Sequence, residues 1–221
     1  MSLVVLKVGG ALAEECGTLV LGLAQKHDVC VVHGAGPQIS AELERSGFEV
    51  RFVEGRRVTS AAALAVVRRS FAAVNEEICS VIGHRAVSLF GDEIGLEALQ
   101  LPELGLVGSP LPSRPPAIEE ALAAGQVPVV VPLAVGPLNV NADEAAAALA
   151  VGLGAERLLF VTDVPGLLLG GAVAATIKVA EAERMLDAGE LAGGIVPKLR
   201  AAVGAAREGV DATIGATAVL A

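Results

Sequence analysis

The chain has 221 residues, of which 53% are hydrophobic, so it can bury a substantial core and is not intrinsically disordered. Its formal net charge of −9 argues against a nucleic-acid or anionic-membrane partner, and the absence of Trp and Tyr removes the usual platforms for base stacking. An anionic substrate must therefore be bound by a few well-placed cations and backbone N–H groups.

Apolar runs rich in Val, Leu and Ile predict β-strands along the chain. In order, these runs are LVVLKVGG, VCVVHGAGP, AVSLFGD, VPVVVPLAVGP and RLLFVTDVPG, and each ends in glycine, proline or polar residues. Runs that are apolar throughout, without alternation, are typical of strands that are covered on both faces in a parallel sheet.

Helical patterns lie between and after these runs, over roughly 13–26, 37–46, 60–82, 115–124, 142–153, 179–189 and 197–208. Alternating strands and helices predict an α/β fold with an open, mainly parallel sheet and helices on both faces. No internal repeat or low-complexity linker divides the chain, so we expect a single domain over residues 1–221. In such a sheet, ligands bind at the carboxyl ends of the strands.

Residues 121–142 carry no charge, which raises the question of a membrane span. The stretch contains three prolines, so a strand followed by a loop is the favoured interpretation. The apolar run at the start of the chain is too short for a signal peptide. The three cysteines are an odd number without a CxxC pair, which fits reduced thiols in a cytoplasmic protein.

Glycine and polar residues gather where the predicted strands end. They are KVGG at 7–10, HGAG at 33–36, NVNAD at 139–143 and TDVPG at 162–166. Glycine turns before a helix let backbone N–H groups approach an oxyanion, although a βα turn also needs glycine for its geometry. Several such turns at one edge predict an anion site. None matches the Walker or dinucleotide-binding pattern.

Two of the four lysines, Lys7 and Lys198, lie near a pair of glycines. A lysine at the end of an apolar strand needs an anionic partner unless its ammonium group reaches solvent, and the repeated pattern favours an anion site. Considered alone, Arg57 fits a solvated turn beside Arg56. His33 fits a core residue that donates to the backbone better than it fits a general base. Three histidines do not make a convincing metal site, so no metal ligand is predicted.

Taken together, these motifs resemble the amino-acid kinase family and, within it, the acetylglutamate branch. The matching pieces are KVGG, HGAGP, GRRVTS, GLVG, VPVVVPLAVG, NVNADEAAAALA, GAERLLFVTDVPGLL and GGIVPKLRAAVGAA, which cover about residues 4–208. The combination of GRRVT with NVNAD is specific to that branch. The resemblance implies a carbamate kinase-like αβα sandwich, with an amino-acid-binding lobe over about 1–135 and a nucleotide-binding lobe over about 136–221.

The resemblance also implies roles for individual residues. Lys7 and Lys198 would stabilise the phosphoryl group during its transfer, and Asp143 would hold both lysines in place. The amino-acid site would comprise Gly34, Ala35, Arg57 and Asn139, with Arg57 pairing the α-carboxylate. The nucleotide site would comprise Gly9, Gly10, Asp163, Val164, Pro165, Gly166, Leu167, Leu168, Gly193 and Gly194. The alternative for Asp143 is a helix N-cap, although a cap needs only one of the polar residues in NVNAD.

The activity implied is ATP-dependent phosphorylation of the side-chain carboxylate of N-acetyl-L-glutamate in arginine biosynthesis, with Mg²⁺ held through the phosphates. No N-terminal extension precedes KVGG, which in this family favours a homodimer. Two alternatives stay open. One is a sister kinase that acts on a protected aminoadipate in lysine biosynthesis, and the other is a non-catalytic ligand-sensing module with a degenerate nucleotide lobe.

The chain departs from the family pattern in three places. HGGGP is HGAGP here, which preserves the backbone contacts if the φ of Ala35 is negative. The segment 169–178 is short. The C-terminal GVDATIGATAVLA lacks the strand-and-helix insert that usually precedes the last strand. The departures therefore concern the nucleotide lobe more than the predicted phosphoryl-transfer site.

Overall fold

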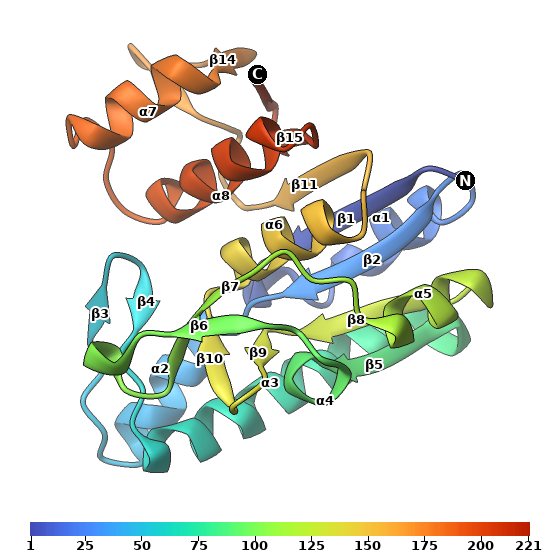
Figure 1. Cartoon of the computed structure of the whole chain (residues 1–221), viewed down its shortest axis with the longest axis vertical. Helices are drawn as coiled ribbons and strands as arrows, with labels where there is room; N and C mark the ends of the chain where they lie inside the picture. Colours follow the sequence, from blue (N-terminus) through green and yellow to red (C-terminus); the bar gives the residue numbers. More distant parts are fainter.

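The computed structural model describes all residues, 1–221, and is built around one eight-stranded sheet (Figure 1). The strands lie in the order β14-β16-β15-β11-β1-β2-β8-β5, and all neighbours are parallel except β15 and β16. The predicted mainly parallel sheet is therefore confirmed. Its strands are β1 (Leu3–Val8), β2 (Asp28–His33), β5 (Ala86–Phe90), β8 (Val127–Val131), β11 (Arg157–Val161), β14 (Thr176–Lys178), β15 (Asp211–Ile214) and β16 (Thr217–Leu220).

Helices cover both faces of this sheet, as predicted. On one face lie α1 (Cys16–Leu23), α2 (Gly36–Arg45) and α3 (Ala61–Ile82), and on the other lie α5 (Pro116–Ala123), α6 (Ala142–Gly152), α7 (Val179–Asp187) and α8 (Ile195–Arg207). Strand β1 contributes side chains to the hydrophobic cores on both faces of the sheet. Val4 and Leu6 pack with the first group of helices, and Val5 packs with the second. Each predicted helical range is confirmed, with ends that shift by a few residues.

Several short elements were not predicted. A second sheet joins β6 (Ala98–Gln100), β7 (Val107–Pro110), β10 (Leu138–Val140) and β9 (Leu133–Ala134). Two hairpins stand apart, β3 (Phe52–Val53) with β4 (Arg56–Arg57), and β12 (Leu168–Leu169) with β13 (Ala172–Val173). The remaining elements are helix α4 (Gly91–Ile94) and the 3₁₀ turns η1 (Gly10–Leu12), η2 (Gly83–Arg85) and η3 (Pro102–Leu104). Elements of two to four residues are too short to show a periodic pattern.

The uncharged stretch 121–142 folds as the end of α5, then β8, β9 and β10. The strand predicted over VPVVVPLAVGP is broken at Pro132, where the chain passes from the main sheet to the smaller one. Proline has no N–H to donate to a strand ladder, which fits the place of Pro132 between the two sheets. No helix of the molecule has the length and apolarity that a membrane crossing requires.

The three cysteines are free, as predicted. Cys30 is fully buried on β2, and burial raises the pKa of its thiol to about 12. A thiol with such a pKa is a core group rather than a reactive one.

The loops after β1 and β2 pack directly against each other. Val8 is paired with His33 in the sheet, and the Gly34 N–H donates to the Val8 carbonyl oxygen at 2.9 Å. Gly10 has no room for a side chain, because a Cβ there would lie 2.8 Å from the Gly34 carbonyl oxygen. The KVGG and HGAG motifs therefore form one continuous surface at the carboxyl ends of the central strands.

Replacement of Gly152 by Ala should destabilise the protein, because a Cβ there would overlap the backbone nitrogen and oxygen of Ser113. We expect Gly152→Ala to lower the free energy of unfolding by about 2 kcal/mol, as for an overpacked core position. Gly204 in α8 is the matched control, since a Cβ there meets nothing within 4 Å. Gly204→Ala should instead stabilise by about 0.5–1 kcal/mol. Denaturant unfolding measures both, and similar shifts in the two variants would contradict the packing argument.

Candidate active site

Three charged side chains from distant parts of the chain meet beside the ends of the central strands. Lys7 Nζ on β1 lies 2.9 Å from Oδ1 of Asp143 at the start of α6, and Lys198 Nζ on α8 lies 3.5 Å from Oδ2. The three side chains are only 8%, 7% and 16% exposed, in the order Lys7, Asp143 and Lys198. One carboxylate is therefore shared between two ammonium groups in a largely dehydrated position.

The environment of Lys7 disfavours its charge. Burial lowers the pKa of Lys7, the neighbouring Asp143 carboxylate raises it, and Lys198 lowers it again, with a net lowering. The alternative that Lys7 reaches solvent past the strand end is wrong, because the residue is 6% exposed and paired. Two ammonium groups with one counter-charge leave an excess positive charge that suits an anionic ligand.

The polar residues of NVNAD perform three separate tasks. Asn141 is the N-cap of α6, since its Oδ1 accepts from the N–H groups of Asp143 at 2.8 Å and Glu144 at 3.2 Å. The alternative that Asp143 caps this helix is therefore wrong. Asp143 lies one residue inside the helix, where its carboxylate is free to face the lysines. Asn139 precedes both on β10, and its Nδ2 donates to Thr59 Oγ1 at 3.0 Å.

A cavity of about 160 Å³ opens beside Lys7 and Asp143. Its walls include all four residues expected in the amino-acid site, Gly34, Ala35, Arg57 and Asn139. Residues that were not predicted also line it, among them Gly36, Ile39, Phe52, Gly55, Arg56, Phe71, Val107, Val140, Asn141 and Ala142. The cavity thus has cationic groups, amide groups and apolar walls, which are the features of a small-ligand site.

Arg57 lies in a wall of this cavity and is only 6% exposed. Its Nη2 donates to the Gly36 carbonyl oxygen at 3.0 Å and to Ser40 Oγ at 2.9 Å, while the guanidinium group stacks 4.5 Å from the Phe52 ring centroid. Its Nη1 is buried without a partner. The interpretation of Arg57 as a solvated turn residue is wrong, and its unused donor suits a carboxylate.

The HGAG turn leads directly into α2. Ala35 has a negative φ of −146°, so the alanine that replaces the family glycine does not need a left-handed backbone, as expected. Ala35 is also the N-cap of α2 and makes no side-chain capping bond. The N–H of Gly36, the first residue of the helix, has no intrahelical acceptor, and Gly36 lines the cavity.

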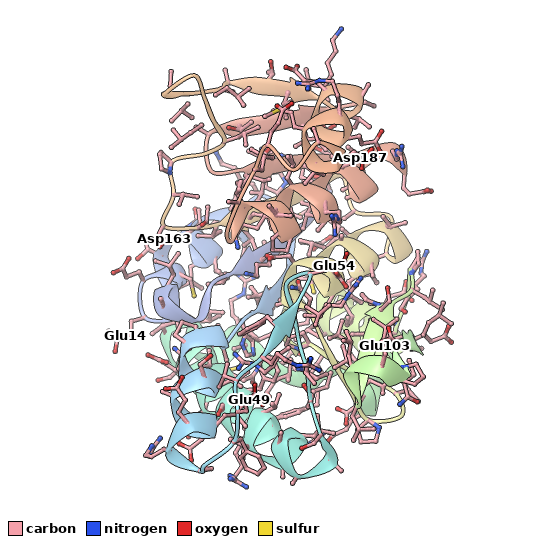
Figure 2. The ribbon with its side chains drawn as sticks, turned by 90° about the vertical axis from the view of Figure 1, so that its left-hand side faces the viewer. Glu14, Glu49, Glu54, Glu103, Asp163 and Asp187 are labelled. Atoms are coloured by element: carbon pink, nitrogen blue, oxygen red, sulfur yellow. The ribbon has the colours of Figure 1, made fainter.

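A second cavity, of about 360 Å³, opens at Lys198. It is lined by Thr162, Asp163, Val164, Ala192, Gly194, Ile195 and Lys198, so three of the residues expected at the nucleotide lie around it. Figure 2 shows Asp163 on the loop after β11, at the junction between the C-terminal part of the chain (orange) and the N-terminal strand (blue). Lys198 thus belongs to this cavity while its partner Asp143 belongs to the first.

The other residues expected at the nucleotide lie outside this lining. Pro165 and Gly166 continue the loop against the turn at Gly215, and Leu167 is 1% exposed in the core with its N–H donating to Thr217 Oγ1 at 2.9 Å. Leu168 is 57% exposed on β12. Of the glycines, Gly193 has a φ of 72°, Gly9 borders open space and Gly10 packs on the HGAG turn.

His33 is a core residue, as its sequence context predicts. Its ring is fully buried, with Nδ1 3.3 Å from the Gly34 carbonyl oxygen and Nε2 3.1 Å from Asn75 Nδ2. Asn75 Nδ2 also donates to the Val129 carbonyl oxygen at 3.0 Å. A neutral ring with its proton on Nδ1 satisfies every one of these bonds, so His33 ties the HGAG turn to α3 and β8.

The site does not provide a protein-bound metal centre. Asp143 is the one carboxylate in the lining of the 160 Å³ cavity, and each of its oxygens faces a lysine. No group of three or more His, Cys, Asp or Glu side chains is placed to hold a metal ion. The chemistry of the chain's own residues is therefore that of an anion clamp.

Comparisons with known proteins agree with the fold. Residues 2–215 match the model of the amino acid kinase family. The acetylglutamate kinase of Rubrobacter xylanophilus is 42% identical over an alignment that covers 97% of this chain and 88% of that protein. Among solved structures, smu.665 from Streptococcus mutans superposes with a TM-score of 0.90 at 26% identity, over 99% of this chain and 98% of that one. The carbamate kinase of Giardia lamblia bound to AMP-PNP gives 0.74 at 15% identity, over 99% and 98%.

Protonation of His33 should weaken the fold as the pH falls. Burial lowers the pKa of His33 to about 4, and a neutral histidine in the unfolded chain titrates near 6.5. Between these values the unfolded chain binds a proton that the folded chain does not, so stability falls as the pH drops from 6.5 towards 4. The loss should be on the order of 2 kcal/mol between pH 7 and pH 4.5.

The measurement compares the free energy of unfolding of the wild type and of His33→Gln across this pH range. Glutamine can still form hydrogen bonds but does not titrate, so the stability advantage of the wild type over the variant should shrink as the pH falls. Curves that run parallel from pH 7 to pH 4.5 would show that His33 is not the titrating group.

Proposed function

Because this chain belongs to the amino acid kinase family, a family of ATP-using kinases that phosphorylate carboxyl groups, we propose that it transfers the γ-phosphoryl group of ATP to the side-chain carboxylate of N-acetyl-L-glutamate. The products are N-acetylglutamyl 5-phosphate and ADP, in a step of arginine biosynthesis. The observation that carries the proposal is the arrangement of Lys7, Asp143 and Lys198 at the meeting point of two cavities.

The arrangement suits a reaction between two anions. A carboxylate that attacks the γ-phosphorus of ATP must approach a polyphosphate, so catalysis consists mainly of alignment and charge neutralisation. Lys7 belongs to the cavity of the amino acid and Lys198 to that of the nucleotide, so each ammonium group can neutralise the transferring phosphoryl group from its own side. Asp143 holds both in position through its two ion pairs.

The 160 Å³ cavity is the proposed amino-acid site, in a lobe that comprises about residues 1–135 with Asn139. Arg57 offers its free Nη1 to the α-carboxylate, and the amide of Asn139 can bond the acetamido group. The side-chain carboxylate then points towards Lys7. The backbone at Gly34 and Ala35 forms the wall between these two ends of the substrate.

The 360 Å³ cavity is the proposed start of the nucleotide site, in a lobe of about residues 136–221. Asp163, Val164 and Gly194 line it, the loop from Pro165 to Leu168 extends it, and Gly9, Gly10 and Gly193 supply close backbone approach. Mg²⁺ would be held through the phosphates of ATP and would neutralise part of their charge, because the carboxylate of Asp143 is already engaged by the lysines.

The test is an ADP-release assay with N-acetylglutamate, glutamate and N-acetylaminoadipate side by side, together with trapping of the acyl phosphate by hydroxylamine. N-acetylglutamate should give the highest kcat/KM and a hydroxamate product. A preference for N-acetylaminoadipate would support a sister kinase instead. Binding of an amino acid by calorimetry without ADP release from any substrate would identify a ligand-sensing module.

Arg57→Ala should raise the KM for N-acetylglutamate strongly and leave the KM for ATP nearly unchanged. The reason is that Arg57 lines the first cavity and not the second, and its free Nη1 can donate to the carboxylate of the amino acid. Arg57→Lys should rescue poorly, because one ammonium group cannot replace Nη2, which is bound to Gly36 and Ser40, and also supply a rigidly placed Nη1. Separate titrations with amino acid and with nucleotide measure the two effects. A variant that loses ATP binding but retains the amino acid would assign Arg57 to the other site.

Asp143→Asn should lower kcat on the order of a hundredfold or more, as for the loss of one oxyanion-binding group. The amide has nearly the same shape, and the helix retains its cap at Asn141, but two neighbouring ammonium groups lose their counter-charge. Turnover and melting temperature are measured on the same preparation. A folded variant with near wild-type turnover would exclude Asp143 from the clamp.

A further inference from the structure

The β3–β4 hairpin is weakly supported by its own contacts. It forms a separate two-stranded sheet, and its Phe52 and Val53 are 51% and 39% exposed. Glu54 and Gly55 form a tight turn with φ values of 48° and 79°. Two consecutive positive φ angles are typical of a two-residue hairpin turn. An isolated two-stranded hairpin is marginally stable in water, so its position depends on what its tip binds.

The tip is bound to the first turn of α6. Arg56 Nη2 lies 2.9 Å from Glu144 Oε1, and Arg56 Nε donates to Oε2 at 3.1 Å, which is a two-pronged pair. Asn141 Nδ2 donates to the Gly55 carbonyl oxygen at 3.0 Å. The residues that hold the tip, Asn141 and Glu144, therefore flank Asp143 in the chain.

The same tip touches the start of α8. A Cβ on Gly55 would lie 3.3 Å from Pro197 Cβ, and Pro197 directly precedes Lys198. Figure 1 shows the hairpin apart from the main sheet with its turn directed at the beginning of α8, and Figure 2 labels Glu54 at that turn. The hairpin thus spans the space between the amino-acid cavity and the helix that carries Lys198.

Arg56 and Arg57 are neighbours on one strand and their side chains point in opposite directions. Arg57 donates hydrogen bonds to Gly36 and Ser40 near the cavity wall, while Arg56 donates to Glu144 on α6. Any displacement of the tip consequently displaces Arg57. Arg56 and Glu144 are 21% and 20% exposed, so their geometry is better defined than that of a fully solvated pair.

We propose that the Arg56–Glu144 ion pair is a latch that holds the β3–β4 hairpin against α6 and so positions Arg57 over the amino-acid cavity. Both residues are positioning residues, which act through Arg57. The kinetic part of this inference rests on the proposed kinase function, whereas the structural part does not.

The test uses two variants. Glu144→Gln removes the negative charge but retains the side-chain shape, and Arg56→Lys retains the positive charge but removes the two-pronged guanidinium group. Arg114→Ala is the matched control, because it breaks another arginine–glutamate pair, with Glu119, on the exposed surface of α5. Hydrogen exchange followed by mass spectrometry reports on peptides that contain residues 52–57 and needs no substrate. Steady-state kinetics with N-acetylglutamate and ATP report on the site.

Glu144→Gln should speed exchange in the hairpin on the order of tenfold while β1 stays protected. The same variant should raise the KM for the amino acid about tenfold and change the KM for ATP less than twofold. Arg56→Lys should give smaller shifts in the same direction, and Arg114→Ala none. The melting temperatures should stay close to that of the wild type, which separates positioning from general stability.

Unchanged hairpin exchange in Glu144→Gln would overturn the latch, as would faster exchange with wild-type kinetics. Equal rises in KM for both substrates would also overturn it, because the latch acts through Arg57 alone. If the wild-type protein does not turn over N-acetylglutamate but exchange responds as expected, the latch is supported and the proposed substrate fails.

Discussion

The site depends on one buried carboxylate that serves two ammonium groups. Removing a charge from water costs several kcal/mol unless a partner compensates it, and Asp143 can fully compensate only one of its two lysines. The remaining positive charge lies in a position that is almost closed to solvent, within a chain whose net charge is −9. The field that attracts an anion is therefore local, and a bound phosphate would complete a charge balance that the protein alone leaves open.

The sheet brings these charges together because β1 lies at its centre. Val8 at the end of β1 is in register with His33 on β2 and with Val161 on β11, so the loops that follow all three strands start at one edge. The alanine-rich α6 packs directly above β1, and buried Ala145 and Ala146 keep its backbone close to the sheet. A larger side chain in this helix would lift Asp143 away from Lys7. Small side chains at Ala145 and Ala146 are thus a geometric requirement of the site.

The sequence predicts what is encoded locally. Continuous apolar runs and helical spacing correctly indicate the parallel sheet and its covering helices. Residues from the predicted strand ends line two cavities. Contacts between distant segments cannot be predicted in this way. Arg56 and Glu144 are 88 positions apart, and no local sequence pattern indicates that they pair. Asn141 and Asp143 are both favourable capping residues, so the sequence cannot decide which one caps and which one faces the lysines. Only the packing of α6 on β1 assigns those tasks.

The C-terminal strands β15 and β16 hold the loop that follows β11. Gly215 joins β15 to β16 in a tight turn with a φ of 54°, packed so closely on the Pro165 carbonyl that a Cβ there would lie 2.6 Å from its oxygen. The Ala216 N–H donates to that oxygen at 2.8 Å, and Thr217 Oγ1 accepts from the Leu167 N–H and donates to the Ala174 carbonyl oxygen. The turn between β15 and β16 thus fixes the position of the loop after β11. This loop needs no longer insert to support it, because the Ala216 N–H and the Thr217 hydroxyl satisfy its backbone groups.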